Sequence, residues 1–329
     1  MIEDIKRLEN ESDFELIKRL VYGKLIDKTL EIPYEDLSEL LFGEGNCFNE
    51  SEVRKRMYGM KRIFEVMELE PNPVATRILG ISDAHVPFNE PITMFQDYVG
   101  KTDILVLNGD IIDQQQISKF PKSYRVSVME ELIQGRQYMI DLIEYIKPKK
   151  VVVTDGNHEK RFGTYFAKNL DSDILELMPD SAMDLIIESG FNHYNKRDKS
   201  KVWYEPLKNV FDDIEIEYSG DWKCKIGKTY FIHPSTYSSG MLKTSEKAIN
   251  YFLRVDRDFD TIVMSHVHKL GSYIQGNIYM FEQGCCCDID KLDYANGKLQ
   301  YPQQKGFIYL CQANDGSLVY DKTKLIELK

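Results

Sequence analysis

Short apolar runs rich in β-branched residues recur along this chain, and each ends at or beside an aspartate, asparagine or histidine. Five such runs occupy residues 77–83, 103–110, 150–158, 229–233 and 260–266. Runs of this kind are typical of strands that are buried on both faces of a sheet. In open α/β sheets, ligands bind outside the carboxyl ends of the strands. The runs therefore predict an α/β fold whose polar side chains gather at one end of its strands.

Five of the six histidines fall in the polar segments at these strand ends, which are SDAH (82–85), NGDIID (108–113), DGNHEKR (155–161), FIHP (231–234) and SHVH (265–268). A phosphoester resists hydrolysis because its anionic oxygens repel a nucleophile. Two divalent cations roughly 3.5–4 Å apart neutralise those oxygens and supply a hydroxide at neutral pH. Carboxylates can bridge two such ions, and neutral imidazoles add affinity without excess negative charge. The segments therefore predict a two-metal centre that hydrolyses phosphoesters.

The order DxH, GDxxD, GNHE, H and HxH resembles the calcineurin-like metallophosphoesterase superfamily over about residues 80–320. The resemblance implies a four-layer α/β/β/α sandwich of two mixed sheets. It also implies two divalent metal ions, with manganese as the leading expectation, although the same ligands accommodate Fe, Zn, Ni or Co.

The seven candidate metal ligands divide into two sets in this family. By resemblance, one metal is held by Asp83, His85 and His268. The second is held by Asn157, His233 and His266, and Asp110 bridges the two ions.

Four further residues lie beside these motifs. By resemblance, His158 contacts the substrate and assists the leaving group, while Asp113 and Glu159 orient the ligands or the catalytic imidazole. Arg161 follows at the expected start of a helix and could bind a substrate phosphate, because Arg pairs with phosphate oxygens. The alternative for Arg161 is a surface residue paired with Glu159 or a neighbouring residue.

Three positions depart from the family pattern without removing a ligand. Ser265 stands where Gly is usual, Val267 replaces the common Thr, and Pro234 follows His233 where Gly is frequent. Because these changes alter the backbone near the phosphate, they bear on substrate geometry more than on metal binding.

The composition is that of a protein with a sizeable core. The chain has 329 residues, 43% of them hydrophobic, and a formal net charge of −11, which argues against coating nucleic acid by bulk electrostatics. No apolar run approaches the roughly 18 residues that cross a membrane, so we expect no membrane partner. The charged start MIEDIKRLENESDFE lacks a signal-peptide pattern, and this predicts a cytoplasmic protein with reduced thiols.

Residues 1–70 lack the strand pattern and predict a small all-α domain, with amphipathic segments at 2–11, 13–26, 34–43 and 50–70. Residues 71–76, with two prolines, predict a linker into the domain at 77–329. A short helix followed by the basic segment 51–62 matches a helix-turn-helix module, and the assembly resembles bacteriophage-type members of the superfamily. The alternative is an accessory or dimerisation domain.

Three further expectations concern the larger domain. Residues 124–147 predict a long amphipathic helix, and the insertion at 163–222 is expected to form a cap over the site. Short runs after residue 270 predict an antiparallel second sheet, and His193 is expected in an exposed loop.

The leading hypothesis for function is a phosphodiesterase or nuclease that acts on DNA. One alternative is a phosphomonoesterase acting on phosphoproteins or nucleotides, or a cyclic-nucleotide phosphodiesterase. A non-enzymatic alternative is a DNA-binding scaffold with a structural metal site, against which the open ligand set and His158 speak. The sequence gives no indication of oligomeric state.

Overall fold

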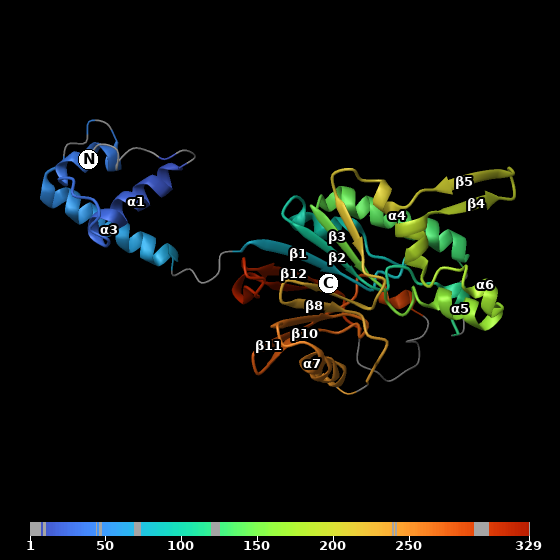
Figure 1. Ribbon diagram of the computed structural model, residues 1–329. Coiled ribbons are helices and arrows are strands. Elements are labelled where there is room, and N and C mark those ends of the chain that lie inside the picture. The colour runs from blue at the N-terminus through green and yellow to red at the C-terminus, as the bar shows by residue number, and fades with distance from the viewer. Residues whose placement is uncertain are drawn as a thin grey trace. The chain divides into compact units, whose positions relative to one another are not determined.

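The computed structural model describes residues 8, 11–43, 45, 48–68, 74–119, 126–238, 240, 242–292 and 303–328. The chain divides into two compact units, Met1–Pro71 and Asn72–Lys329. Figure 1 shows the helices and strands of each unit.

The first unit is helical. Its elements are α1 (Asp13–Leu25), the 3₁₀ turn η2 (Glu35–Leu37), α2 (Ser38–Phe42) and α3 (Glu50–Glu68). Ser12 caps α1 and forms a reciprocal capping box with Glu15, which satisfies amide groups at the helix start. Apolar side chains spaced by helical turns pack into one core, for example Leu20, Leu37 and Met57. Three of the predicted helices are thus confirmed, while the segment 2–11 lies outside the described residues except for Leu8 and Glu11.

The second unit contains a six-stranded sheet in the order β13-β12-β1-β2-β3-β6. Its strands are β13 (Lys324–Glu327), β12 (Gly306–Gln312), β1 (Thr76–Ile81), β2 (Ile104–Asn108), β3 (Lys150–Thr154) and β6 (Glu215–Tyr218). The strands β1, β2, β3 and β6 are parallel, whereas β12 and β13 are antiparallel additions. This arrangement brings the segments after β1, β2 and β3 to the same end of the sheet.

A five-stranded sheet has the order β10-β11-β9-β8-β7. Its strands are β10 (Leu270–Gln275), β11 (Ile278–Gln283), β9 (Thr261–Met264), β8 (Thr229–Ile232) and β7 (Lys223–Ile226). The expectation of a separate antiparallel sheet after residue 270 was wrong: β10 and β11 join this mixed sheet, and β12 and β13 join the first. One of the short runs after residue 270 that were expected to form strands, residues 317–321, forms only an isolated bridge at Leu318 and the start of a 3₁₀ turn, η9 (Tyr320–Lys322).

The two sheets pack face to face, and helices cover their outer faces, so the unit has four layers (Figure 1). Alternate residues of each central strand divide between two cores. Leu79 and Ile81 belong to the core that contains residues of α4 (Val128–Ile146), whereas Ile78 belongs to the core between the sheets. The second sheet packs its other face against α7 (Lys243–Val255). Because both faces are buried, the strands read as continuous apolar runs, and the predicted α/β/β/α sandwich is confirmed.

The segment between β3 and β7 contains helices, a β-hairpin and a strand of the first sheet. It contains α5 (Arg161–Asn169), α6 (Ser172–Leu175), η5 (Asp184–Ser189), η6 (Leu207–Asn209) and the hairpin β4 (Phe191–Asn195)–β5 (Ser200–Tyr204), which extends away from both sheets (Figure 1). The strand β6 belongs to the first sheet. His193 lies in β4 and is partly buried, so its assignment to an exposed loop was wrong.

Shorter 3₁₀ segments connect the main elements: η3 (Ile92–Tyr98), η4 (Gln115–Ile117) and η7 (Ile289–Lys291). None of the helices among the described residues is long and apolar enough to span a bilayer.

Candidate metal centre

The loops after β1, β2 and β9 hold their polar residues in an unusual backbone conformation. The φ angle is 50° at Asp83, 48° at His85, 51° at Asp110, 76° at His266 and 51° at His268. Residues other than glycine rarely adopt positive φ, at a cost of about 1–3 kcal/mol each, and they cluster at functional sites. Five of the seven candidate ligands therefore sit on strained backbone that the surrounding packing enforces.

Two glycines allow the loops to approach each other. A Cβ atom on Gly156 would lie 2.1 Å from Asp110 Oδ1, and one on Gly109 would lie 2.5 Å from His233 Nδ1. Both distances are shorter than any ordinary contact. The glycine before the aspartate of NGD and the glycine before Asn157 are therefore required by close packing at the centre.

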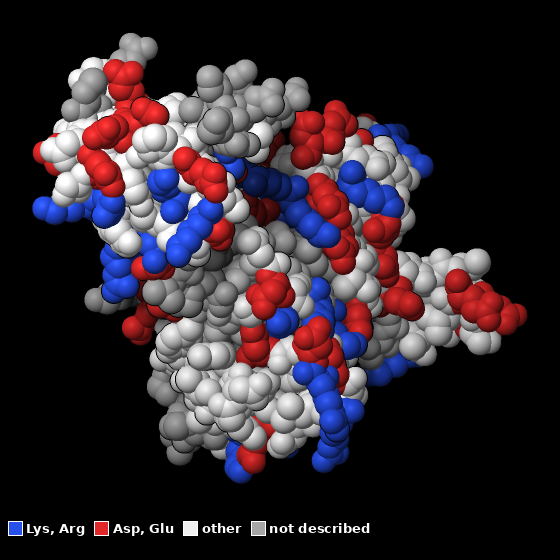
Figure 2. All heavy atoms as spheres, turned by 60° about the vertical axis from the view of Figure 1, so that its left-hand side comes forward, with Lys and Arg blue, Asp and Glu red and all other residues white. Residues whose placement is uncertain are grey.

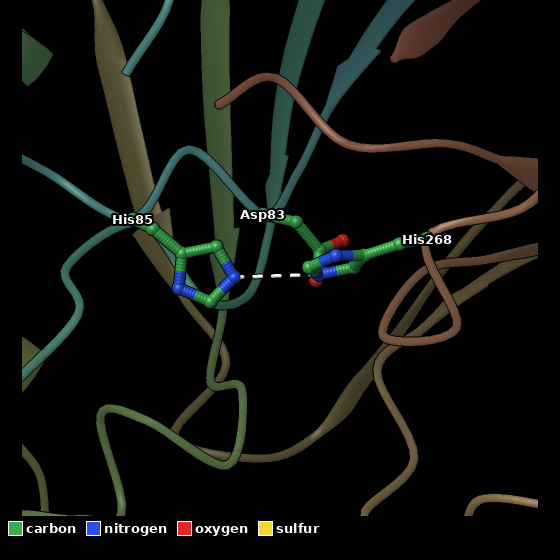
Figure 3. Close-up of side chains that lie close together, drawn as sticks. All are labelled: Asp83, His85 and His268. Carbon is green, nitrogen blue, oxygen red and sulfur yellow. Dashed lines mark hydrogen bonds and ion pairs between the residues drawn. The ribbon is translucent and has the colours of Figure 1, made fainter. Parts of the chain in front are cut away.

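Asp83, His85 and His268 form one group of buried side chains that point toward one another (Figure 3). His268 Nε2 lies 3.0 Å from Asp83 Oδ1 and 3.3 Å from His85 Nε2. The Nδ1 atoms of both rings donate hydrogen bonds to residues outside this group. His85 Nδ1 donates to Asp113 Oδ1 at 3.1 Å, and His268 Nδ1 donates to Gln303 Oε1 at 3.0 Å. In the neutral rings the Nε2 lone pairs then face each other and a carboxylate, which is an arrangement that a cation stabilises.

Asp110, His233 and His266 form a second group. His233 donates from Nδ1 to the Asn108 carbonyl at 2.9 Å, and its Nε2 lies 3.2 Å from Asp110 Oδ2. Burial opposes the charging of His233, but the carboxylates of Asp110 and Asp83 overcome it and raise the pKa of this imidazole to about 9. The centre therefore attracts positive charge.

Asn157 extends this second group. It follows β3, and its Oδ1 is buried without a hydrogen-bond partner among the described residues. A buried acceptor without a partner is costly, and a cation satisfies it. Carboxylate and amide oxygens together with imidazole nitrogens are the donors that divalent transition metals prefer. The residues present therefore fit divalent metal ions.

Asp113 lies between His85 and His158, and the three residues form a third close group. His158 Nδ1 lies 2.8 Å from the Asp113 carbonyl oxygen and 2.9 Å from Asp113 Oδ1. Hydrogen bonds from both imidazoles outweigh burial and hold the pKa of Asp113 far below its usual value. The Asp113 carboxylate thus lies within hydrogen-bond distance of two histidine rings.

Arg161 begins α5 and does not pair with Glu159. Its guanidinium donates to the Asp113 carbonyl and to His158 Nε2, both at 2.7 Å. Glu159 instead accepts hydrogen bonds from the backbone amides of Asp110, Ile111, Ile112 and Gly156. This carboxylate ties the loop after β3 to the loop after β2, so the part of the alternative that paired Arg161 with Glu159 was wrong.

Gln303, Ser265 and Asn108 lie near the ligands and hold them through hydrogen bonds that the sequence did not predict. Gln303 binds His268 although it lies 35 positions away, and no local pattern marks it. Ser265, noted only as a departure, donates to the carbonyls of Asn108 and Ile232 at 2.8 and 3.0 Å. The serine therefore joins the ends of β2, β8 and β9, and the Asn108 carbonyl holds both Ser265 and His233.

A cavity of about 550 Å³ opens onto the centre. Ligand candidates from both groups line it, namely Asp110, Asn157, His266 and His268, together with His158. Its other walls carry the cations Lys119, Arg161, Lys168 and Lys269 and the rings of Tyr165 and Tyr237. Among the described lining residues Asp110 is the one carboxylate, although the chain as a whole carries a net charge of −11.

The sequence profile of the calcineurin-like phosphoesterase family matches residues 76–270, so the chain belongs to this family. Members are metal-dependent phosphoester hydrolases, and the chain shares that activity class. No curated protein matches the chain.

The chain is also similar to solved structures. They include vacuolar protein sorting 29 from Cryptosporidium parvum, with 14% identity over 78% of this chain and 98% of that chain and a TM-score of 0.37. A novel archaeal phosphodiesterase has 15% identity over 77% and 99%, with a TM-score of 0.34. A metallophosphoesterase from Sphaerobacter thermophilus has 13% identity over 77% and 88%, with a TM-score of 0.34.

Proposed function

We propose that this hydrolase is a dinuclear phosphodiesterase that acts on DNA. The observation that carries the proposal is the cavity beside the ligand groups, where four cations and two tyrosines line a space on an otherwise acidic protein. A single phosphate needs few of these groups. A polynucleotide supplies several phosphates for the cations and bases that stack on aromatic rings.

Each ligand group would hold one divalent ion. Asp83, His85 and His268 form the first, and Asn157, His233 and His266 the second, with Asp110 shared between them. Divalent cations there would neutralise the charge of the phosphate oxygens and activate water for attack on phosphorus. Manganese is the first metal to test.

The chain's own residues position the substrate and the departing oxygen. Asp113 holds His158 by Nδ1, which leaves Nε2 as the atom that meets the leaving group. Arg161 donates to the same Nε2 in this structure. When a phosphate enters, the guanidinium transfers this hydrogen bond to an anionic oxygen and so frees His158 Nε2.

The helical unit would add DNA affinity. Arg54, Lys55 and Arg62 are exposed on α3, as expected for a helix that contacts phosphates. Figure 2 shows acidic and basic side chains interspersed over the face in view.

The test compares bis-p-nitrophenyl phosphate with p-nitrophenyl phosphate, each assayed with manganese and with EDTA. We expect metal-dependent hydrolysis that favours the diester, followed by cleavage of single-stranded or duplex DNA. A strong preference for the monoester would overturn the diesterase proposal and favour the phosphomonoesterase alternative. Hydrolysis of a cyclic nucleotide without cleavage of DNA would favour the cyclic-nucleotide alternative.

A further inference from the structure

A second cavity, of about 400 Å³, adjoins the metal centre. Asn157 and Ser235 line both cavities, and His233 lines the second. The two spaces therefore meet at the candidate ligands. A phosphorus atom held at the centre would have room for a substituent on each side.

The second cavity has an aromatic wall. Trp222 and Tyr251 line it, with ring centroids 5.9 Å apart and planes inclined by 59°. The Trp222 carbonyl accepts a hydrogen bond from the His233 amide at 2.7 Å, which fixes this wall relative to the centre. Tyr251 lies on α7, where Thr244, Lys247, Ala248 and Tyr251 form one stripe at helical spacing. The stripe faces the cavity along two turns.

The charge of this cavity is positive. Lys160 and Lys247 line it with exposed side chains, and no carboxylate is found among its described lining residues. Lys247 Nζ donates to Ser238 Oγ at 2.8 Å. Aromatic rings beside cations are the combination that binds single-stranded nucleic acid, since the rings stack on bases and the cations contact phosphates.

We infer that this cavity is a nucleoside subsite in which Tyr251 stacks on the base next to the scissile phosphate, Trp222 contacts the edge of that base, and Lys160 and Lys247 bind the following phosphate. The inference rests on the proposed diesterase function and specifies its substrate as a nucleotide chain that passes through both cavities. It assigns Trp222, Tyr251 and Lys247 to substrate specificity.

The first test uses intrinsic fluorescence, because the chain has two tryptophans and the other, Trp203, lies on β5 with 54% of its surface exposed. In full-length Trp203→Phe protein, Trp222 is the sole reporter. With EDTA present to prevent turnover, thymidylyl-(3′→5′)-thymidine should quench its emission saturably. Adding Tyr251→Ala should weaken this binding roughly 5- to 150-fold, the range expected for loss of one stacked base. No response, or the same response to inorganic phosphate, overturns the inference.

The second test is kinetic and uses the metal-loaded enzyme. The ratio of kcat/KM for thymidine 3′-phosphate 5′-p-nitrophenyl phosphate to that for methyl p-nitrophenyl phosphate should fall in Tyr251→Ala, which removes the ring that stacks on the base, and in Lys247→Gln, which removes a contact with the 3′-phosphate. Tyr194→Ala, on β4, and Lys243→Gln, one turn earlier on α7, are the matched controls and should keep the parental ratio. An unchanged ratio in both test variants overturns the subsite while the diesterase function stands. If neither diester is hydrolysed, the proposed function fails and the fluorescence titration still decides the subsite.

Discussion

At the scale of single residues, Asp110 connects the parts of the centre. Its Oδ1 accepts from the His158 amide at 2.9 Å, and its Oδ2 lies 3.2 Å from His233 Nε2. Burial opposes its charge, but the surrounding histidines hold the pKa of this carboxyl well below its usual value. The side chain is therefore ionised and available to two cations.

Replacing Asp110 by Asn should abolish activity and lower the metal content, because the amide cannot balance two cations. Metal analysis and diesterase assays measure the result. Asp141→Asn, on the outer helix α4, is the control and should keep both metal and activity. Near-normal turnover of Asp110→Asn with two metals bound would contradict the bridging role.

Replacing His158 by Gln should leave the metal content largely intact and slow turnover by roughly 10²–10⁴-fold, the usual range for a positioned acid–base group. The loss should shrink for substrates with very good leaving groups, which need little protonation. His193→Gln, in the β4 hairpin, is the matched control. An equal loss across leaving groups would rule out the leaving-group role.

Glu131 predicts a pH effect on stability. It is fully buried in α4, and burial raises its pKa to about 8, so the folded protein keeps a proton that the unfolded chain releases above its ordinary pKa. The free energy of unfolding should therefore fall as pH rises toward 8, by at most about 1.4 kcal/mol per pH unit from this group. Glu131→Gln should remove this slope in denaturant titrations at pH 5.5 to 8. If the free energy of unfolding depends on pH equally in both proteins, Glu131 is ionised in the folded state.

At the scale of elements, the loops that follow the strands position the candidate ligands. The parallel register pairs Ile78 with Ile104 and Ile104 with Lys150, so the loops after β1, β2 and β3 emerge side by side. Glu159 then joins two of these loops through backbone amides. Small changes in these loops should matter more than larger changes elsewhere in the sheets.

Gly156→Ala should therefore reduce metal content and activity by at least 10-fold, since its Cβ atom would meet Asp110 Oδ1. The same substitution at Gly271, in β10, meets no heavy atom within 4 Å and is the control. Circular dichroism of both variants checks that the fold is kept. Full activity of Gly156→Ala would show that the loops can separate without harm.

At the scale of the whole molecule, the chain combines an enzyme with a helical unit of unassigned role. Arg56 is a poor residue for testing DNA binding. It lies over the ring of Phe48, with 4.0 Å to the centroid, and supports the helical core, so its replacement would also affect the fold. Lys55 and Arg62, together with Arg54, which lies farther from a ring, with 5.0 Å to the centroid of Tyr34, are the better test residues.

In the full-length protein, changing these three residues to Gln should weaken duplex binding and reduce the salt dependence by up to about one unit per lost phosphate contact. A triple Gln variant at Lys196, Arg197 and Lys201, on the β4–β5 hairpin, removes the same charge and should bind like the parent. Fluorescence anisotropy over a range of salt concentrations measures both. Equal binding by the two variants would favour the accessory or dimerisation alternative.

The sequence by itself determined the central strands that end at the polar segments, and the ligand candidates at those ends. Strands buried on both faces must be apolar throughout, so the polar residues at their ends stand out, as at Asp83 and Asp110. The family resemblance supplied the layer order. These features are local or follow from the order of motifs along the chain.

Only the tertiary structure decided which distant groups meet. The contact of Gln303 with His268, the two hydrogen bonds of Arg161 and the wall formed by Trp222 and Tyr251 join segments that share no local pattern. The placement of β10 to β13 in two different sheets likewise depends on which edge each strand can reach. Such pairings are set by the packing of whole layers, because no short stretch of sequence specifies the partner of a side chain across the fold.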